Sequence, residues 1–126
     1  MHETLLKEIG LTNGETKVYL SLTKLGESTV GPIAKEADVS LSKIYEILEN
    51  LIKKGLVSHI VKNNTKYFLS TDPERIIDYL EEKKKDITNS ENQIKEILPS
   101  LKAQKEKNEE KTKATLYEGL RGIKSF

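Results

Sequence analysis

The sequence predicts a mainly α-helical fold with one small β-hairpin, followed by a long helix of the coiled-coil type. Over residues 1–54, apolar residues recur at helical spacing in runs bounded by capping residues or glycines. Two short runs rich in β-branched and aromatic residues follow at 56–61 and 66–70. Beyond residue 73, isoleucine and leucine repeat at intervals of seven within a highly charged segment.

The first two helices are predicted from their boundaries. A short helix ends at Gly10 and contains three apolar residues, Leu5, Leu6 and Ile9. Thr12 and Glu15 then have the spacing of a capping box, in which each side chain accepts a hydrogen bond from the other residue's backbone N–H. The helix that follows ends at Gly26 and has apolar residues at helical spacing: Val18, Tyr19, Leu22 and Leu25.

A tight turn at Asp38–Val39 is predicted to join two further helices. Ser28 or Thr29 caps the first, whose apolar residues are Ile33, Ala34 and Ala37. Ser40 caps the second, over residues 40–54, and Gly55 ends it. We expect the inward face of this second helix to consist of Leu41, Ile44, Ile47 or Leu48, and Leu51.

The hairpin and the last helix complete the predicted elements. Asn63–Asn64 is a plausible two-residue turn because asparagine tolerates positive φ. A long helix then begins with Asp72 as its N-cap and Pro73 as its first residue, and Pro99 should kink or end it. Its heptad spacing predicts a seam for dimerisation, in parallel or antiparallel pairing, formed by Ile77, Leu80, Ile87, Ile94, Leu98 and Leu101.

Three segments are therefore expected along the chain. Residues 1–72 form the compact domain, and residues 73–113 form the dimerisation helix with a charged linker. Lys84 and Glu91 interrupt the second seam of this helix and could set its register by pairing across the dimer. The sequence changes character again at 114–126, where 114–117 reads as a strand followed by a loop into another helix.

Composition excludes several classes of protein. The chain has no cysteine, so a disulfide scaffold, a thiolate-held metal and a cysteine nucleophile are excluded. No apolar run approaches the ~20 residues of a membrane span, and the N-terminus lacks the pattern of a secretory signal, so we expect a cytoplasmic chain. Neither a glycine-rich phosphate loop nor a nucleophile–base set is recognisable, and we expect no enzymatic activity and no metal or organic cofactor.

The order of the elements is that of a winged helix-turn-helix. The helix over 40–54 buries one face and leaves the other for the major groove of duplex DNA. Its start offers hydroxyls, free N–H groups and a lysine to phosphates and base edges, from Ser40, Leu41, Ser42 and Lys43. The hairpin tip offers two lysines and two amides to the DNA backbone or the minor groove, namely Lys62, Asn63, Asn64 and Lys66.

Residues 9–80 also resemble the N-terminal domain of the archaeal TrmB-like transcriptional regulators. The resemblance rests on an ordered set of motifs: GLT, E-x-K-V-Y-L-x-L, LG, I-A-x-x-x-x-V-S-x-S-K-I-Y-E-I-L-x-x-L, K-K-G-L-V and K-Y-F. It implies a homodimeric, sequence-specific regulator that contacts double-stranded DNA through the helix-turn-helix and the wing. By position, the resemblance maps these contacts onto the wing residues 62–66 and onto Thr29, Ser40, Leu41, Ser42, Lys43 and Tyr45.

Leu41 departs from the family pattern, because the second position of the recognition helix is often basic in such regulators. With one cation in this turn, contact with a thymine methyl group or recognition of DNA shape is favoured over direct reading of guanine. In the resembling family, a Y-x-G-x-x-G-I segment like that at 117–123 opens a C-terminal effector domain. The resemblance therefore implies that residues 114–126 begin a missing effector domain, and no effector ligand is expected for this chain.

Charge leaves one alternative open. Residues 1–80 hold ten basic and eleven acidic groups, so any affinity for nucleic acid must come from local arrangement. A winged-helix module that binds protein within a larger transcription or regulatory assembly, without direct contact to DNA, is the second hypothesis.

Overall fold

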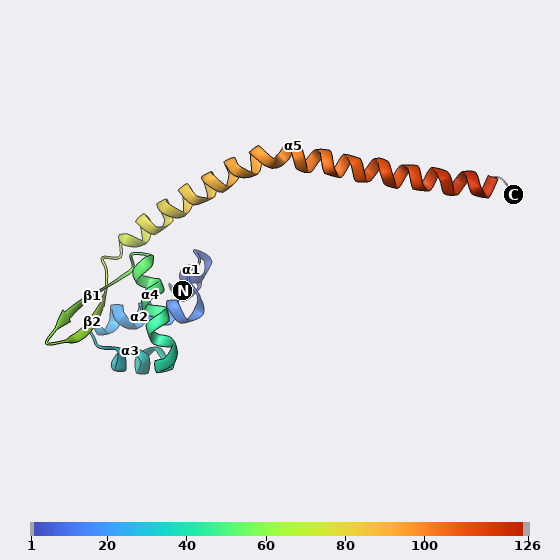
Figure 1. The fold of residues 1–126 in the computed structure, drawn as a ribbon. Coiled ribbons are helices and arrows are strands. Elements are labelled where there is room, and N and C mark those ends of the chain that lie inside the picture. The colour runs from blue at the N-terminus through green and yellow to red at the C-terminus, as the bar shows by residue number, and fades with distance from the viewer. Residues whose placement is uncertain (1, 125–126) are drawn as a thin grey trace. The chain divides into compact units, whose positions relative to one another are not determined.

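The computed structural model describes residues 2–124, and the side chains of residues 2–119. The chain divides into two compact units, one ending at Lys83 and the other beginning at Lys84. In chain order the elements are α1 (His2–Glu8), α2 (Asn13–Leu25), α3 (Val30–Ala37), α4 (Leu41–Lys53), β1 (Val57–Lys62), β2 (Thr65–Ser70) and α5 (Arg75–Lys124), as Figure 1 shows. The mainly helical fold with one hairpin and a long last helix is thus confirmed.

The capping box at the start of α2 is present as predicted. The Thr12 backbone N–H donates to Glu15 Oε1 over 2.8 Å, and the Glu15 N–H donates to Thr12 Oγ1 over 3.1 Å. At the other end, Gly26 has a φ of 77° and its N–H donates to the Leu22 carbonyl. A residue with a side chain is strained at such a positive φ, so glycine suits this stop.

The turn between α3 and α4 is also as predicted, with Asp38 in the left-handed region at a φ of 55°. Thr29 and Ser40 are the N-cap residues, but neither hydroxyl makes a capping hydrogen bond. The predicted N-cap positions are therefore confirmed, and only the hydrogen bonds expected from their hydroxyls are not formed. Ser40 Oγ instead lies 3.0 Å from Ser42 Oγ, which ties the two hydroxyls to each other at the start of α4.

β1 and β2 pair antiparallel, with Lys62 opposite Thr65. Asn63 and Asn64 both have positive φ, at 50° and 62°, which confirms the two-residue turn and its type I′ geometry. The sequence did not predict a third, isolated pairing. Ser28 bridges Phe68, through backbone hydrogen bonds of 2.9 and 2.7 Å, and this ties the loop before α3 to the hairpin.

The core of the first unit lies between α2, α3, α4 and the hairpin. Its largest fully buried apolar side chains are Val18, Leu22, Ile33, Ile44, Leu48, Leu51 and Leu56. The sequence left open whether Ile47 or Leu48 belongs to the inward face of α4. Leu48 is buried and Ile47 is half-buried, so Leu48 is the core residue. Leu41 is 60% exposed, so its assignment to the inward face is wrong. It has the helical spacing of a core residue but lies in the first turn, where no neighbouring element covers it.

α5 begins two residues later than predicted. Asp72 Oδ1 accepts a hydrogen bond from the Glu74 N–H over 2.9 Å, and Pro73–Glu74 form a turn before the helix. Early α5 residues belong to the first unit, since Tyr79 Oη and Lys83 Nζ both donate to the Ile9 carbonyl. The first unit therefore includes the start of α5.

The strand predicted for residues 114–117 is wrong, because these residues are helical. α5 continues through Pro99, so of the two outcomes expected for this proline, an end of the helix is excluded. The backbone groups of a helix are satisfied within the helix, whereas a strand needs a partner, and the only sheet in the described part of the chain is β1–β2. Of the predicted 114–126 segment, residues 125–126 lie outside the described residues. Within the described part, no helix has both the length and the apolar character needed to cross a membrane.

Candidate nucleic-acid interface

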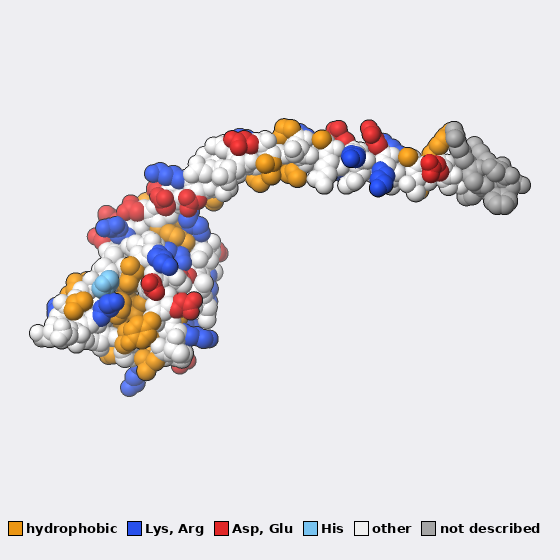
Figure 2. Space-filling model, viewed as in Figure 1, with side chains coloured by type: hydrophobic (Ala, Val, Ile, Leu, Met, Phe, Trp, Pro, Cys, Tyr) orange, Lys and Arg blue, Asp and Glu red, His pale blue; other side chains and the backbone are white. Residues whose placement is uncertain are grey.

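The first turns of α4 present predicted contact residues to solvent. Leu41 and Tyr45 are 60% and 59% exposed, and they lie four residues apart on one side of the helix. Ser42 and Lys43 are also exposed, while Thr29, at the start of α3, is half-buried. Figure 2 shows exposed hydrophobic side chains on this unit beside lysines and carboxylates. An exposed apolar pair next to a lysine suits a surface that meets both base methyl groups and phosphates.

A groove of about 480 Å³ separates the starts of α2 and α4. Lys17 and Lys43 line it from the two helices, together with the N-cap residue Ser40. The helices approach closely here: a Cβ on Gly14 would lie 2.8 Å from Ile47 Cδ1. Asp38 also lines the groove and offsets part of its positive charge. The groove therefore places Lys17, which sequence reasoning did not single out, beside Lys43 in the first turn of α4.

The wing holds its two lysines in different environments. Lys62 Nζ lies 2.7 Å from Glu27 Oε2 and 5.5 Å from the centre of the Tyr67 ring. Lys66 is exposed and makes no ion pair within the described residues. The charge of Lys62 is thus partly neutralised, while that of Lys66 is not. Sequence reasoning missed Glu27 because it is 35 residues from Lys62 in the chain. The neighbouring residue Ser28 bridges Phe68 of the hairpin.

A buried ion pair links the start of α2 to the end of α4. Glu15 is 1% exposed, and its Oε2 lies 2.5 Å from Lys54 Nζ. Burial by itself raises the pKa of Glu15, but hydrogen bonds from Lys54 and Thr12 outweigh it and the net pKa lies below its ordinary value. The sequence predicted only the capping box, so this carboxylate has a second partner that orients the recognition helix.

The outward side of α4 carries charges that sequence reasoning also left out. Glu46, Glu49 and Lys53 are exposed on the same side of α4 as the predicted contact residue Ser42. Helical spacing places this side opposite the buried Ile44, Leu48 and Leu51. The same periodicity that identified the core face could have found this face.

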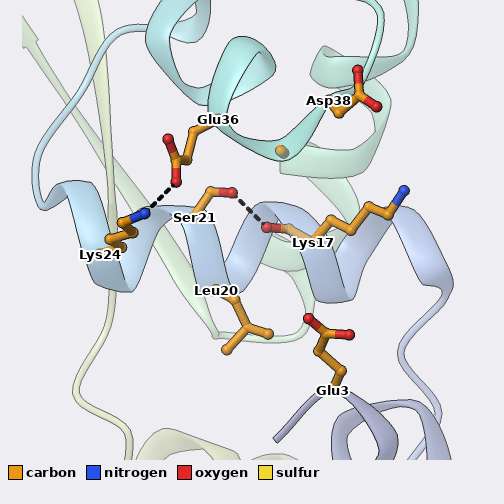
Figure 3. Close-up of a pocket in the computed structure, with 8 residues that line it drawn as sticks. Glu3, Lys17, Leu20, Ser21, Lys24, Glu36 and Asp38 are labelled. Atoms are coloured by element: carbon orange, nitrogen blue, oxygen red, sulfur yellow. Dashed lines mark hydrogen bonds and ion pairs between the residues drawn. The ribbon is translucent and has the colours of Figure 1, made fainter.

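A second groove, of about 300 Å³, lies between α1, α2 and α3 (Figure 3). Lys24 Nζ reaches across it to Glu36 Oε1 over 2.8 Å, as Figure 3 shows, and this hydrogen bond raises the pKa of Lys24. Glu3 and Asp38 add further acidic groups. Its cations are balanced by carboxylates, so this groove is less suited to phosphate than the groove beside α4.

No group of three or more metal-ligating side chains occurs in the part of the chain described.

The residues predicted for dimerisation are divided between the two units. Ile77 is 58% exposed and Leu80 half-buried in the first unit. In the second unit, four predicted residues are between 37% and 64% exposed: Ile87, Ile94, Leu98 and Leu101. Ile97, which the heptad pattern omitted, is 48% exposed beside them. We call these five residues of the second unit the α5 stripe. In the single chain it is uncovered.

Comparison with known proteins places residues 6–74 in a family. The profile of the family described as "Sugar-specific transcriptional regulator TrmB" matches residues 6–74. The chain is 34% identical over 77 residues to the HTH-type sugar sensing transcriptional regulator TrmBL1 of Pyrococcus furiosus, covering 61% of this chain and 22% of that protein. It is 36% identical over 75 residues to the uncharacterized protein YrhO of Bacillus subtilis, covering 58% and 26%.

Among solved structures, that of TrmBL2 is similar to this chain with a TM-score of 0.58 and 25% identity. The similarity covers 77% of this chain and 39% of TrmBL2, which is described as an archaeal chromatin protein with a novel mode of DNA binding. The chain spans only about a quarter of the length of the curated relatives it matches.

Proposed function

The chain belongs to the TrmB family of transcriptional regulators, and from this premise we propose that its first unit is the DNA-binding part of a transcriptional regulator. The observation that carries the proposal is the exposed first turn of α4, where Leu41, Ser42 and Lys43 are presented outward by a helix whose other face is buried. The DNA binding described for TrmBL2 supports the same conclusion.

The proposed docking places the outer side of α4 in the major groove of duplex DNA. Leu41 and Tyr45 would then contact thymine methyl groups, because both residues are exposed and the leucine side chain and the tyrosine ring are apolar. Lys43 and Lys17, which line one groove, would neutralise phosphates beside the major groove. Phosphate contacts fix the position of a protein on the duplex, and base contacts select the sequence.

The wing would contact the backbone or the minor groove next to this site. Asn63, Asn64 and Lys66 are exposed at or beside the turn of the hairpin. Lys62 can reach a phosphate only by giving up part of its interaction with Glu27. Thr29, at the N-cap of α3, would complete the set with a contact to a phosphate.

The test is the dependence of duplex binding on salt. For binding to mixed-sequence duplex DNA, the logarithm of the association constant should fall linearly with the logarithm of the salt concentration. The slope should be about −0.9 for each phosphate neutralised. Three or more contacts per protomer would give a steep slope. Binding that is absent, or that does not change with salt, would favour the alternative of a protein-interaction module.

We also propose that the regulator is a homodimer joined through the α5 stripe. The stripe is an apolar line on an otherwise highly charged helix, and a second copy of the same stripe would cover it. A dimer could place two α4 helices in successive major grooves, about 34 Å apart. Either parallel or antiparallel pairing is compatible with the stripe.

The substitution Ile94→Asp is expected to convert this dimer to a monomer, because it puts an unpaired carboxylate into the apolar seam. Sedimentation equilibrium should give twice the chain mass of 14.3 kDa for the original protein and the single mass for the variant. Gln93→Asp, at the exposed neighbouring position, adds the same charge beside the stripe and should leave the dimer intact. Equal masses for the original protein and Ile94→Asp would contradict the proposed seam.

A further inference from the structure

Glu46 lies at the centre of the α4 face that the proposed docking turns toward DNA. It is exposed and follows Ser42 by four residues, one helical turn further along the same side. The buried residues Ile44 and Leu48 flank it in sequence and point the opposite way. The position of Glu46 is therefore set by the packing of α4 and not by its own contacts.

The carboxylate of Glu46 has no compensating cation in the part of the chain that the structure describes. Three other glutamates of the first unit, Glu15, Glu27 and Glu36, each pair with a lysine at 2.5 to 2.8 Å. Glu46 takes part in no ion pair or hydrogen bond within the described residues. A negative charge on a surface that meets phosphates opposes binding, unless the carboxylate accepts a hydrogen bond from a donor on the DNA.

The major groove offers a specific donor for such a carboxylate. The N4 amino group of cytosine donates hydrogen bonds there, and glutamate or aspartate is the side chain that accepts them. Adenine also has a donor, N6, but its neighbouring N7 is an acceptor that repels a carboxylate. Guanine and thymine present acceptors at this edge. Among the four bases, cytosine is therefore the one that Glu46 can bind favourably.

We propose that Glu46 is a specificity-determining residue that selects a cytosine in each half of the DNA site, a proposal that rests on the DNA-binding function above. Residues near the start of a recognition helix reach the base edges. Glu46 is within the second turn of α4, whereas Glu49 lies nearly a turn further from the start and has Lys53 four residues away on the same face. Glu49 is accordingly the natural control.

The experiment uses the tightest duplex recovered by the full chain from a random pool, with each base pair of a half-site then changed in turn. For the original protein, one cytosine should be preferred over the other bases by roughly 10-fold. In Glu46→Gln the preference at that position should move to adenine, because glutamine pairs with adenine N6 and N7. Glu46→Ala should lose the preference there and bind mismatched duplexes more tightly than the original protein does. Glu49→Gln should keep the cytosine.

The outcomes separate the two proposals. Salt-sensitive binding with the same base preference in the original protein, Glu46→Gln and Glu46→Ala would overturn the role of Glu46 and leave the DNA-binding function standing. Failure of the original protein to bind any duplex would overturn both. Because Glu46 is exposed and has no ion pair within the described residues, its variants should unfold at the temperature of the original protein, which separates a change of specificity from a loss of fold.

Discussion

Replacing both Lys43 and Lys62 with glutamate is expected to lower the affinity for duplex DNA by about 100-fold or more near 0.1 M salt. The change removes two cations from the proposed interface and adds two anions that repel phosphates. The slope of the log–log salt plot should become shallower by about 2 per protomer, or about 4 for the dimer, since each phosphate contact contributes close to one unit. Fluorescence anisotropy with a labelled duplex measures both quantities. Both side chains are exposed, so the variant should remain folded.

Two variants test whether the loss is local. Lys7→Glu combined with Lys107→Glu makes the same total change in charge at exposed positions outside the proposed interface, and it should change the affinity only a few-fold. Glu27→Gln should instead tighten binding, because it releases Lys62 from its ion pair. If the outlying pair of substitutions weakens binding as much as the pair at Lys43 and Lys62, the interface is not at α4 and the wing.

Replacing Glu15 with alanine is expected to lower the free energy of unfolding by about 2–4 kcal/mol, because one substitution removes the carboxylate half of the capping box and leaves Lys54 without its carboxylate. The lower part of that range reflects the side chain of Lys54, which is 25% exposed and can regain water. Urea unfolding followed by circular dichroism measures the change. Glu8→Ala, at an exposed position on α1, should stay within about 0.5 kcal/mol. A similar small effect for Glu15→Ala would contradict the structural role of the pair.

Glu15 should also make stability depend on pH. Its pKa in the folded chain is below the ordinary value of 4.5, so its ionised form stabilises the fold above that pH. The contribution is lost as the pH falls from about 4.5 through the lower folded pKa. The difference in stability between the original protein and Glu15→Gln should therefore shrink below this pH. A difference that stays constant from neutral pH to pH 3 would show that the carboxylate charge has no such role.

Local signals account for the parts of the fold that the sequence predicted. The capping box, the stop at Gly26 and the turn at Asn63–Asn64 each depend on residues within four positions of one another. Long-range features were beyond such reasoning. Glu15 and Lys54 are 39 residues apart, and no pattern in the sequence indicates that they meet.

Two remaining differences between prediction and structure concern Leu41 and residues 114–117. The helical spacing of Leu41 is that of a core residue, and only the packed structure shows that its side chain is 60% exposed. At the same position it is available for the contact with DNA that the family resemblance implies. Residues 114–117 have the composition of a strand, but helix formation satisfies their backbone without a partner. The contact residues on α4 and the wing stay predictions. The ion pair with Glu27 lowers the contribution that we expect from Lys62 to DNA affinity.

The central claim is that this chain reads duplex DNA as a dimer through α4 and the wing, and selection of bound sites from random duplex DNA tests it most directly. The account predicts enrichment of a two-fold symmetric site whose half-sites are centred about 10 base pairs, or one helical turn, apart. Each half-site should contain a thymine-bearing position for Leu41 and a cytosine for Glu46. A pool that stays random after repeated rounds of selection with the purified chain would contradict the account.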